Sequence, residues 1–384
     1  FPSVVPSLSL NFARSKTLDP RITFSRASSS GDATYMDENG LIVTAAADEP
    51  RFDHKIENGV VKSLGLLVEE QRTNLILYSN DFSQSNWIKQ NSHPTPSKNA
   101  IGPDGVANSA STFYRTATNQ YLYQTASGGG TYTLSAWVKS EAATGSFIMQ
   151  GYNATDGSMS ESFTATNEWQ RFETTISTTT NTHYYPCIPT NTNTNFYVWG
   201  FQVESGSFKT SYIPTSGSTK TRVNDILSIQ GTNFTDVYNQ TEGSYKVEGF
   251  IDGTLPSNTY GGIFGAGGGS ATSNFIFLNP SNSFGQYVSN TSQTPNSTLG
   301  KTYTNGAKFK IAASYLEADF ACSFNGDISN SSTSGALYGS MTYFRIGGNP
   351  ILGLTGGIKG AMRISNISYY PKQITDTQLQ NLTK

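Results

Sequence analysis

Leu64-Gly65-Leu66-Leu67-Val68-Glu69-Glu70-Gln71-Arg72-Thr73-Asn74-Leu75-Ile76-Leu77-Tyr78 places an apolar run on each side of the polar segment 69–74. Such a segment is hard to bury unless its charges are paired. We therefore interpret the stretch as a junction, at which a buried strand ends an N-terminal segment and residues 75–78 open a β-domain. Arg72 is expected to neutralise a carboxylate between them. The open alternative is a surface turn with solvated charges.

Catalysis by Glu69 or Glu70 is disfavoured at this junction. General acid–base catalysis usually needs a shifted pKa and a cleft, and two adjacent carboxylates indicate neither.

Length and composition predict an all-β chain of several domains. With 384 residues, the chain exceeds a typical single core, so two or three domains are expected. Its residues are 14% charged and 12% aromatic, which is unlike a disordered chain. Short strands joined by Gly, Asn and Ser turns fit this profile, and long helices do not. We predict tandem antiparallel β-sandwiches, or jelly rolls, after a small β-rich connector.

Charge and cysteine content exclude several classes of partner. The formal net charge is −2 and no Lys/Arg cluster stands out, so nucleic acid is not an expected partner. Cys187 and Cys322 lie far apart, which gives no disulfide framework. No apolar run has the length of a membrane span, so membrane insertion is not expected. The start of the chain lacks signal-peptide features and a Met, and we expect a processed product or a fragment.

Residues 1–78 are predicted to form the N-terminal connector. Asn39-Gly40 between Tyr35-Met36 and Leu41-Ile42-Val43 predicts a β-hairpin. Arg51, Asp53 and His54 then bring base, acid and imidazole together. A loop tied by an arginine–carboxylate pair is favoured over a histidine site, because no other His or Cys lies nearby in sequence.

Four ordered motifs resemble a segment that recurs in bacteriophage tail-fibre and capsid-fibre proteins. They are Thr23-Phe24-Ser25-Arg26-Ala27-Ser28, Asp37-Glu38-Asn39-Gly40-Leu41-Ile42, Glu49-Pro50-Arg51-Phe52-Asp53-His54 and Leu66-Leu67-Val68-Glu69-Glu70-Gln71-Arg72-Thr73-Asn74-Leu75. The resemblance implies a virion protein on the phage particle surface, with the segment connecting to binding modules. It also implies other virion proteins as partners and a homo-oligomer, commonly a trimer.

The second predicted domain, residues 79–218, carries the candidate binding residues. Strands are expected over 131–139, 169–176 and 195–204. Their alternation places Trp137 with polar residues on one face, and Trp169 with Arg171 and Glu173. Trp199 is expected in the core, with Phe201 and Val203.

An aromatic ring beside polar side chains can stack on a sugar while its neighbours bind the hydroxyl groups. We therefore predict a carbohydrate site at Trp137, Trp169, Arg171 and Glu173. The open alternative is that each Trp packs under a loop or against a neighbouring domain.

This domain resembles the jelly-roll carbohydrate-binding modules of phage fibres and glycosidases. The matching segments are Asp81-Phe82 to Trp87, Gly102-Pro103-Asp104-Gly105, Trp137-Val138-Lys139, Glu168-Trp169-Gln170-Arg171 and Gln202-Val203-Glu204-Ser205-Gly206. The resemblance implies a possible structural calcium, whose ligands the sequence does not assign.

The third predicted domain, residues 219–384, contains further short strands. It resembles a concanavalin-like or laminin-G-like sandwich at Phe320 to Gly326, Phe344-Arg345-Ile346-Gly347-Gly348 and Ile364 to Leu382. Thr375 and Gln378 have capping-box spacing and predict a terminal helix. The glycine-rich stretch 261–269 is predicted to turn between strands.

We favour a non-catalytic fibre, spike or capsid appendage that attaches to host cell-surface polysaccharide. One alternative is a purely architectural virion protein. Another is a tail-associated glycan-cleaving enzyme, which needs two carboxylates across a groove. Acidic residues available for that role are Asp252, Glu317, Asp319 and Asp327.

Overall fold

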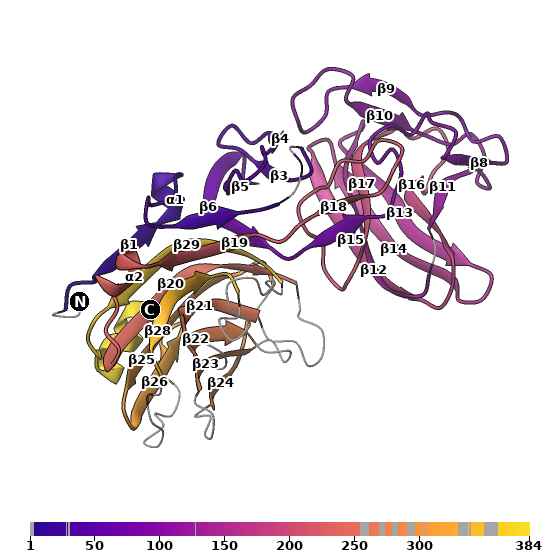
Figure 1. The fold of residues 1–384 in the computed structure, drawn as a ribbon. Helices are drawn as coiled ribbons and strands as arrows, with labels where there is room; N and C mark the ends of the chain where they lie inside the picture. Colours follow the sequence, from indigo (N-terminus) through magenta and orange to yellow (C-terminus); the bar gives the residue numbers. More distant parts are fainter. Residues whose placement is uncertain are drawn as a thin grey trace.

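The computed structural model is mostly antiparallel β-structure, which confirms the predicted all-β class. It describes residues 4–27, 29, 31–126, 128–253, 261–268, 273–278, 283–289, 296–303, 305–328, 337, 339–348 and 360–384. Two sandwiches lie at opposite ends of the molecule in Figure 1. The helices of the described part are short: α1 (Phe12–Ser15), α2 (Thr232–Thr235) and α3 (Asp376–Thr383).

The middle sandwich corresponds to the second predicted domain and consists of two five-stranded sheets. In spatial order, one contains β15 (Gln170–Thr178), β12 (Gly130–Ser140), β17 (Phe196–Ser205), β10 (Ala110–Phe113) and β9 (Ser97–Ala100). The other contains β14 (Gly157–Thr166), β13 (Thr144–Asn153), β16 (Thr182–Pro189), β11 (Tyr121–Ala126) and β8 (Ile88–Gln90). Side chains that alternate along these strands meet in a core that includes Leu134, Phe147 and Trp87.

The second sandwich packs an eight-stranded sheet on a seven-stranded sheet. The first runs β27 (Asp327–Ile328), β26 (Asp319–Phe324), β25 (Lys308–Leu316), β20 (Glu242–Asp252), β29 (Ala361–Tyr370), β6 (Val60–Glu69) and β5 (Arg51–Glu57), with β1 (Leu8–Asn11) also on β29. The other runs β2 (Thr23–Ser25), β19 (Ile226–Gln230), β28 (Met341–Ile346), β21 (Gly261–Gly268), β22 (Ser273–Leu278), β23 (Ser283–Ser289) and β24 (Asn296–Thr302).

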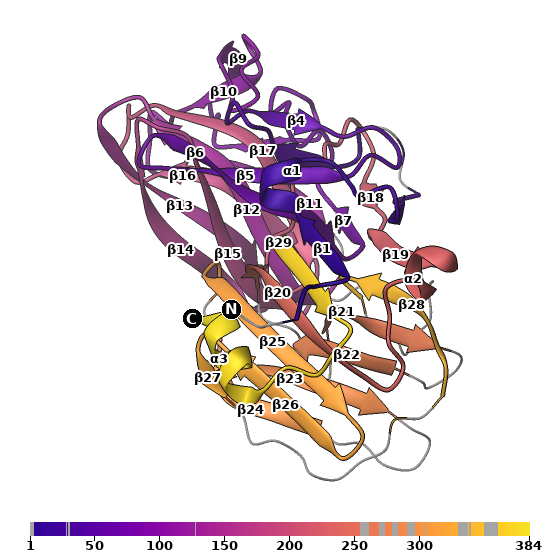
Figure 2. The same cartoon turned by 90° about the vertical axis from the view of Figure 1, so that its left-hand side faces the viewer.

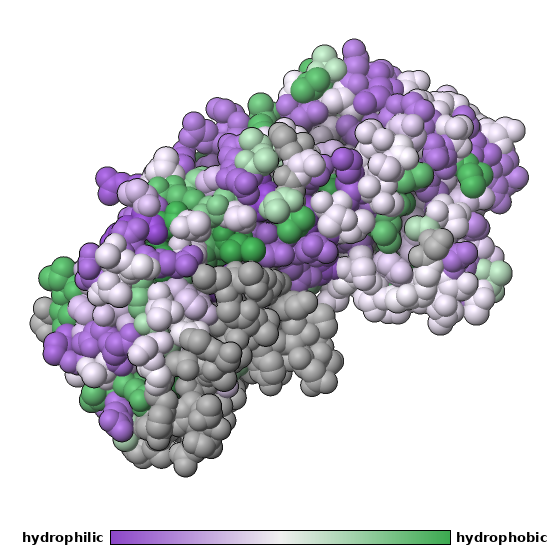
Figure 3. All heavy atoms as spheres, in the orientation of Figure 1, coloured by the Kyte–Doolittle hydropathy of each residue, from purple (hydrophilic) through white to green (hydrophobic). Residues whose placement is uncertain are grey.

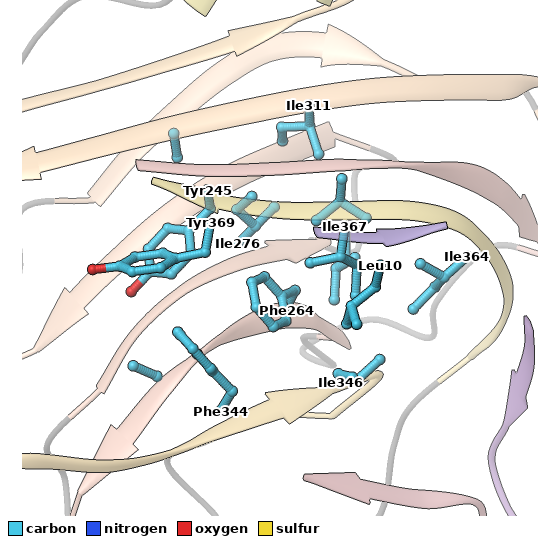
Figure 4. Close-up of a cluster of buried hydrophobic side chains, with 14 of the residues drawn as sticks. Leu10, Tyr245, Phe264, Ile276, Ile311, Phe344, Ile346, Ile364, Ile367 and Tyr369 are labelled. Atoms are coloured by element: carbon cyan, nitrogen blue, oxygen red, sulfur yellow. The ribbon is translucent and has the colours of Figure 1, made fainter. Parts of the chain in front are cut away.

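The N-terminal segment is built into this second sandwich, whereas the sequence suggested a connector with its own strands. β1 and β6 both pair with β29, and β2 pairs with β19. Figure 2 shows β1 beside β29. In Figure 4, Leu10 lies near Ile364 and Ile367 in the shared core. Full burial of one such aliphatic side chain contributes about 1.5–3 kcal/mol, so the two chain regions stabilise each other.

Several predicted elements lie where the sequence placed them. β3 (Thr34–Met36) and β4 (Ile42–Thr44) form the hairpin around Asn39-Gly40. Thr375 and Gln378 form a reciprocal capping box on α3. The glycine-rich stretch, however, is strand β21 over residues 261–268, and Gly269 lies outside the described residues. At Gly265 an added Cβ would stand 2.2 Å from Phe275 Cβ, so close packing between strands explains the glycine there.

The junction predicted at residues 64–78 is confirmed. Here the chain crosses from the second sandwich to the middle sandwich, and the charges beside this crossing are paired. Arg72 Nε lies 2.7 Å from Glu70 Oε1, as the sequence predicted for Arg72. β7 (Arg72–Asn74) pairs with β18 (Lys220–Arg222), so the outgoing and returning chains cross together. Leu75 N then donates to Val203 O at 2.9 Å, which starts the middle sandwich.

Beside this crossing, five side chains form a buried charge cluster that we call the junction network. They are Arg26, Arg51, Glu69, Arg222 and Asp225, each no more than 2% exposed. Arg51 bridges both acids, at 2.7 Å from Glu69 Oε2 and 2.7 Å from Asp225 Oδ2. Removing Glu69 or Asp225 would leave a buried arginine without a carboxylate partner among the described residues, so the network fixes how the chain segments meet.

The network also corrects the loop predicted at residues 51–54. These residues belong to β5, and Arg51 pairs with Glu69 and Asp225 instead of with Asp53.

Within the junction network, burial opposes the charged form of Glu69, but Arg222 and Arg51 hold the pKa of this carboxyl well below its usual value.

Candidate functional site

A cleft of about 430 Å³ lies between the middle sandwich and the second sandwich. Its walls come from four parts of the chain. The N-terminal segment provides β3 and β5, the middle sandwich provides β12 and the start of β15, the connector after β17 provides residues 209–212, and the second sandwich provides β20 and β29. The aromatic side chains on these walls are Tyr35, Trp137, Trp169, Tyr212 and Phe250.

Trp137 stands at the centre of the wall formed by the middle sandwich. In β12 it lies opposite Arg171 of β15 on one side and Trp199 of β17 on the other. Directly opposed residues in antiparallel strands have Cβ atoms about 4.5–5.5 Å apart, so the three side chains form a row. Trp137 is half-buried and lines the cleft.

Trp199 is buried, but it does not lie in the sandwich core as the alternation predicted. It packs with Ala110 and Tyr212 on the outer face, and its ring centroid is 4.7 Å from that of Tyr212. The cause is an irregularity in β17, where Gly200 adopts φ 63° and the register with β12 shifts. An extra residue in a strand reverses which side chains face inward, and a period of two cannot reveal it.

Trp169 lies just before β15 and also lines the cleft. One face of its ring is near the Lys139 ammonium, which stands 5.2 Å from the ring centroid. Lys139 lies at the same distance from Tyr197. A cation over an aromatic face is stabilising, and it fixes the Trp169 ring.

Arg171 lines the cleft, while Glu173 lies in an adjoining pocket of about 170 Å³. The two spaces share Lys209 and Asp252, so they form one groove. Lys209 Nζ donates to Glu173 Oε1 at 2.7 Å. Burial lowers the pKa of Arg171 and of Lys209, and the nearby acids offset this only in part.

On the opposite wall, Arg363 holds two acids. Its Nε is 2.5 Å from Asp53 Oδ2, and its Nη1 pairs with Asp252. Asp53 Oδ1 also accepts a hydrogen bond from Met36 N at 2.8 Å, which ties the β3–β4 hairpin to β5.

Two buried ring nitrogens on cleft-lining side chains have no partner among the described residues: Trp137 Nε1 and His54 Nε2. His54 Nδ1 lies 3.0 Å from Met36 O, which can only accept, so Nδ1 is the donor. Buried Nε atoms of Arg26, Arg51 and Arg222 in the junction network also have no partner among the described residues, so such atoms do not by themselves mark a ligand site.

Other predicted features lie elsewhere. Within the described residues, no group of three or more His, Cys, Asp or Glu side chains is placed to hold a metal ion, and the structural calcium stays a prediction. Of the acids named for a cleaving enzyme, only Asp252 lines the cleft; Glu317, Asp319 and Asp327 lie outside it. No described helix has the length and apolarity that a membrane crossing needs.

The sequence did not identify the second wall of the cleft. Phe250 and Arg363 carry no local sequence signal, and the hairpin pattern at Tyr35 and the loop predicted around His54 do not indicate the wall of a cleft. On the face shown in Figure 3, the middle sandwich is mostly hydrophilic or neutral, with hydrophobic residues in scattered spots. Aromatic side chains also gather outside the cleft, where Tyr121, Tyr123 and Tyr152 contact Tyr185 and His183.

No family model and no curated protein matches the chain. Solved structures match it at low identity. They include the Ruminococcus gnavus IT-sialidase CBM40 bound to α2,6 sialyllactose, with 14% identity and a TM-score of 0.34 over 40% of this chain and 88% of that one. The leech intramolecular trans-sialidase has 16% identity and a TM-score of 0.34 over 40% and 25% of the two chains. Botulinum neurotoxin type C has 12% identity and a TM-score of 0.33 over 41% and 40%.

At these TM-scores the likeness carries no argument about function, and the chain spans only a quarter of the leech enzyme. The resemblance to phage fibre segments stays a prediction.

Proposed function

We propose that this protein is a non-catalytic virion component, a phage fibre, spike or capsid appendage, that attaches to host cell-surface glycans through the cleft. The observation that carries the proposal is the row of Trp137 and Arg171 facing the cleft, with Trp169 beside it. Sugar sites combine an aromatic platform with a few converging polar groups, and this cleft has both.

The virion setting rests on the ordered motifs in residues 23–75. On a particle surface, many copies or a trimer would turn weak single-site binding into firm attachment through avidity. The partners in this proposal are host polysaccharide and other virion proteins.

A glycan-cleaving enzyme is the weaker candidate. Asp53 and Asp252 both line the cleft, but both contact the same Arg363 guanidinium. Paired catalytic carboxylates act from opposite sides of a glycosidic bond. Two carboxylates gathered on one arginine do not present that arrangement.

Attachment of the purified protein to host cells, with and without enzymatic removal of surface polysaccharide, tests the proposal. We expect binding that is lost when the polysaccharide is stripped. Binding that survives stripping, or a protein that joins virions but never binds cells, would instead favour a purely architectural role. Release of reducing ends from the polysaccharide would establish the enzyme.

A further inference from the structure

We propose that the cleft selects glycans that carry a carboxylate, such as polymers of uronic acids, and that Arg171 is the residue that binds this group. The inference rests on the proposed function and specifies its ligand class. It depends on a difference between Arg171 and the other cations of the cleft.

Among the residues that the structure describes, Arg171 lies within ion-pair distance of no carboxylate, unlike its neighbours. Arg363 pairs with Asp53 and Asp252, and Lys209 pairs with Glu173 at 2.7 Å. Lys55, also on the cleft wall, pairs with Glu57. The Arg171 side chain instead donates from Nη2 to the hydroxyl of Ser135 at 3.0 Å.

The three acids whose fields reach Arg171 already have other partners. Glu173 accepts from both the backbone N and the Nζ of Lys209. Glu204, which is fully buried, accepts from the backbone N and hydroxyl of Thr210 and from Gln202. Glu69 pairs with Arg51 and Arg222 in the junction network. Each acid is engaged elsewhere, so the guanidinium stands in a partly desolvated cleft with a charge that a ligand can complement.

The shape of the site favours a carboxylate on a sugar ring. A guanidinium presents parallel N–H groups that match the two oxygens of a carboxylate. Arg171 lies directly opposite Trp137 across neighbouring strands. A pyranose stacked on the Trp137 ring therefore brings a carboxylate substituent beside Arg171.

The test compares the binding of polygalacturonate and alginate with that of the same polymers after chemical reduction of their carboxyl groups, by calorimetry on the full chain. We expect the acidic polymers to bind on the order of 10- to 100-fold more tightly, as hydrogen bonds to charged groups do. Arg171→Gln should abolish this preference and Arg171→Lys should restore part of it, since lysine keeps the charge but loses the planar fork.

Arg14→Gln is the matched control, because Arg14 is exposed on α1 and is absent from the cleft lining. It removes the same charge and should leave the preference unchanged. Equal binding of acidic and reduced polymers would overturn the inference while leaving glycan binding intact. If Arg171→Gln kept the preference, or if dextran sulfate bound wild type as tightly as the uronates, carboxylate recognition by Arg171 would be wrong. Binding of none of these polymers would count against the inference and the proposed function together.

Discussion

The junction network and the cleft both bring arginines near acids, yet the two regions differ in how completely the charges are paired. In the junction network, Arg51 contacts two carboxylates and Glu69 contacts Arg51 and Arg222, all of them buried, while the partly buried Ser211 also donates to Glu69. In the cleft, half-buried tryptophans surround Arg171, which has a hydroxyl as its partner. Complete pairing marks a structural role, and an incompletely paired cation beside aromatic rings marks a binding role.

The two regions also touch. Ser211 donates to Glu69 from its backbone N and its hydroxyl, each at 2.7 Å, and it lines the cleft as well. The network therefore holds the connector that forms part of the binding wall. Substitutions in the network should therefore disturb the cleft, whereas substitutions in the cleft should leave the network intact.

The largest effect is expected from Glu69→Gln. It leaves Arg51 and Arg222 without their shared carboxylate, and breaking a buried pair in this way costs about 3–5 kcal/mol of unfolding free energy. Urea unfolding at neutral pH measures this loss of unfolding free energy. Glu57→Gln, at an exposed acid that pairs with Lys55 and Lys62, is the control and should leave the unfolding midpoint in place. Equal midpoints for both variants would mean that the network does not stabilise the fold.

Lowering the pH should remove the stabilisation that the Glu69 carboxylate gives to the wild-type protein. The pKa of Glu69 lies below its ordinary value of 4.5 in the folded protein, so its stabilisation is present above pH 4.5 and is lost as the pH falls toward the folded pKa. We expect the difference in unfolding free energy between wild type and Glu69→Gln to shrink steadily below pH 4.5. A difference that stays constant down to pH 3 would contradict this assignment.

In the cleft, Trp137→Ala should weaken attachment to host cells by about tenfold, equivalent to about 1.4 kcal/mol, with the fold retained. The matched control is Tyr152→Ala, since Tyr152 is an exposed aromatic side chain on β13, outside the cleft. Trp169→Ala should have a smaller effect, because Lys139 already occupies one face of that ring. Unchanged attachment in both tryptophan variants would remove them from the proposed site.

The smallest effect is expected for the cation–π contact between Lys139 and Trp169. A double-mutant cycle with Lys139→Met and Trp169→Ala should give a coupling of about 0.5–1 kcal/mol in unfolding free energy, as expected for a partly exposed cation–π contact. Additive single effects would show that Lys139 and Trp169 act independently.

Local patterns were enough to predict many individual elements. The hairpin at Asn39-Gly40, the capping box at Thr375 and the strand faces that carry Trp137 and Arg171 depend on turn chemistry and on a period of two. The polar segment 69–74 could be recognised as a junction because burial of charge demands pairing.

The position of Trp199 and the glycine-rich strand could not be predicted in this way. A single irregularity at Gly200 reverses the alternation, and the glycines of β21 follow from the bulk of neighbouring strands such as β22. A glycine inside a strand can mark a bulge or a close approach, but the alternation alone does not say which.

By itself, the sequence determined the all-β class, a number of individual strands and the strand faces that carry Trp137 and Arg171, because these depend on residues close together in the chain. Tertiary structure decided that the N-terminal strands complete the second sandwich, that Arg51 pairs with Glu69 and Asp225, and that Arg363 and His54 line the same cleft as Trp137. The physical reason is that sheet pairing and charge pairing select partners by proximity in space, and partners such as Arg51 and Asp225 lie 174 residues apart.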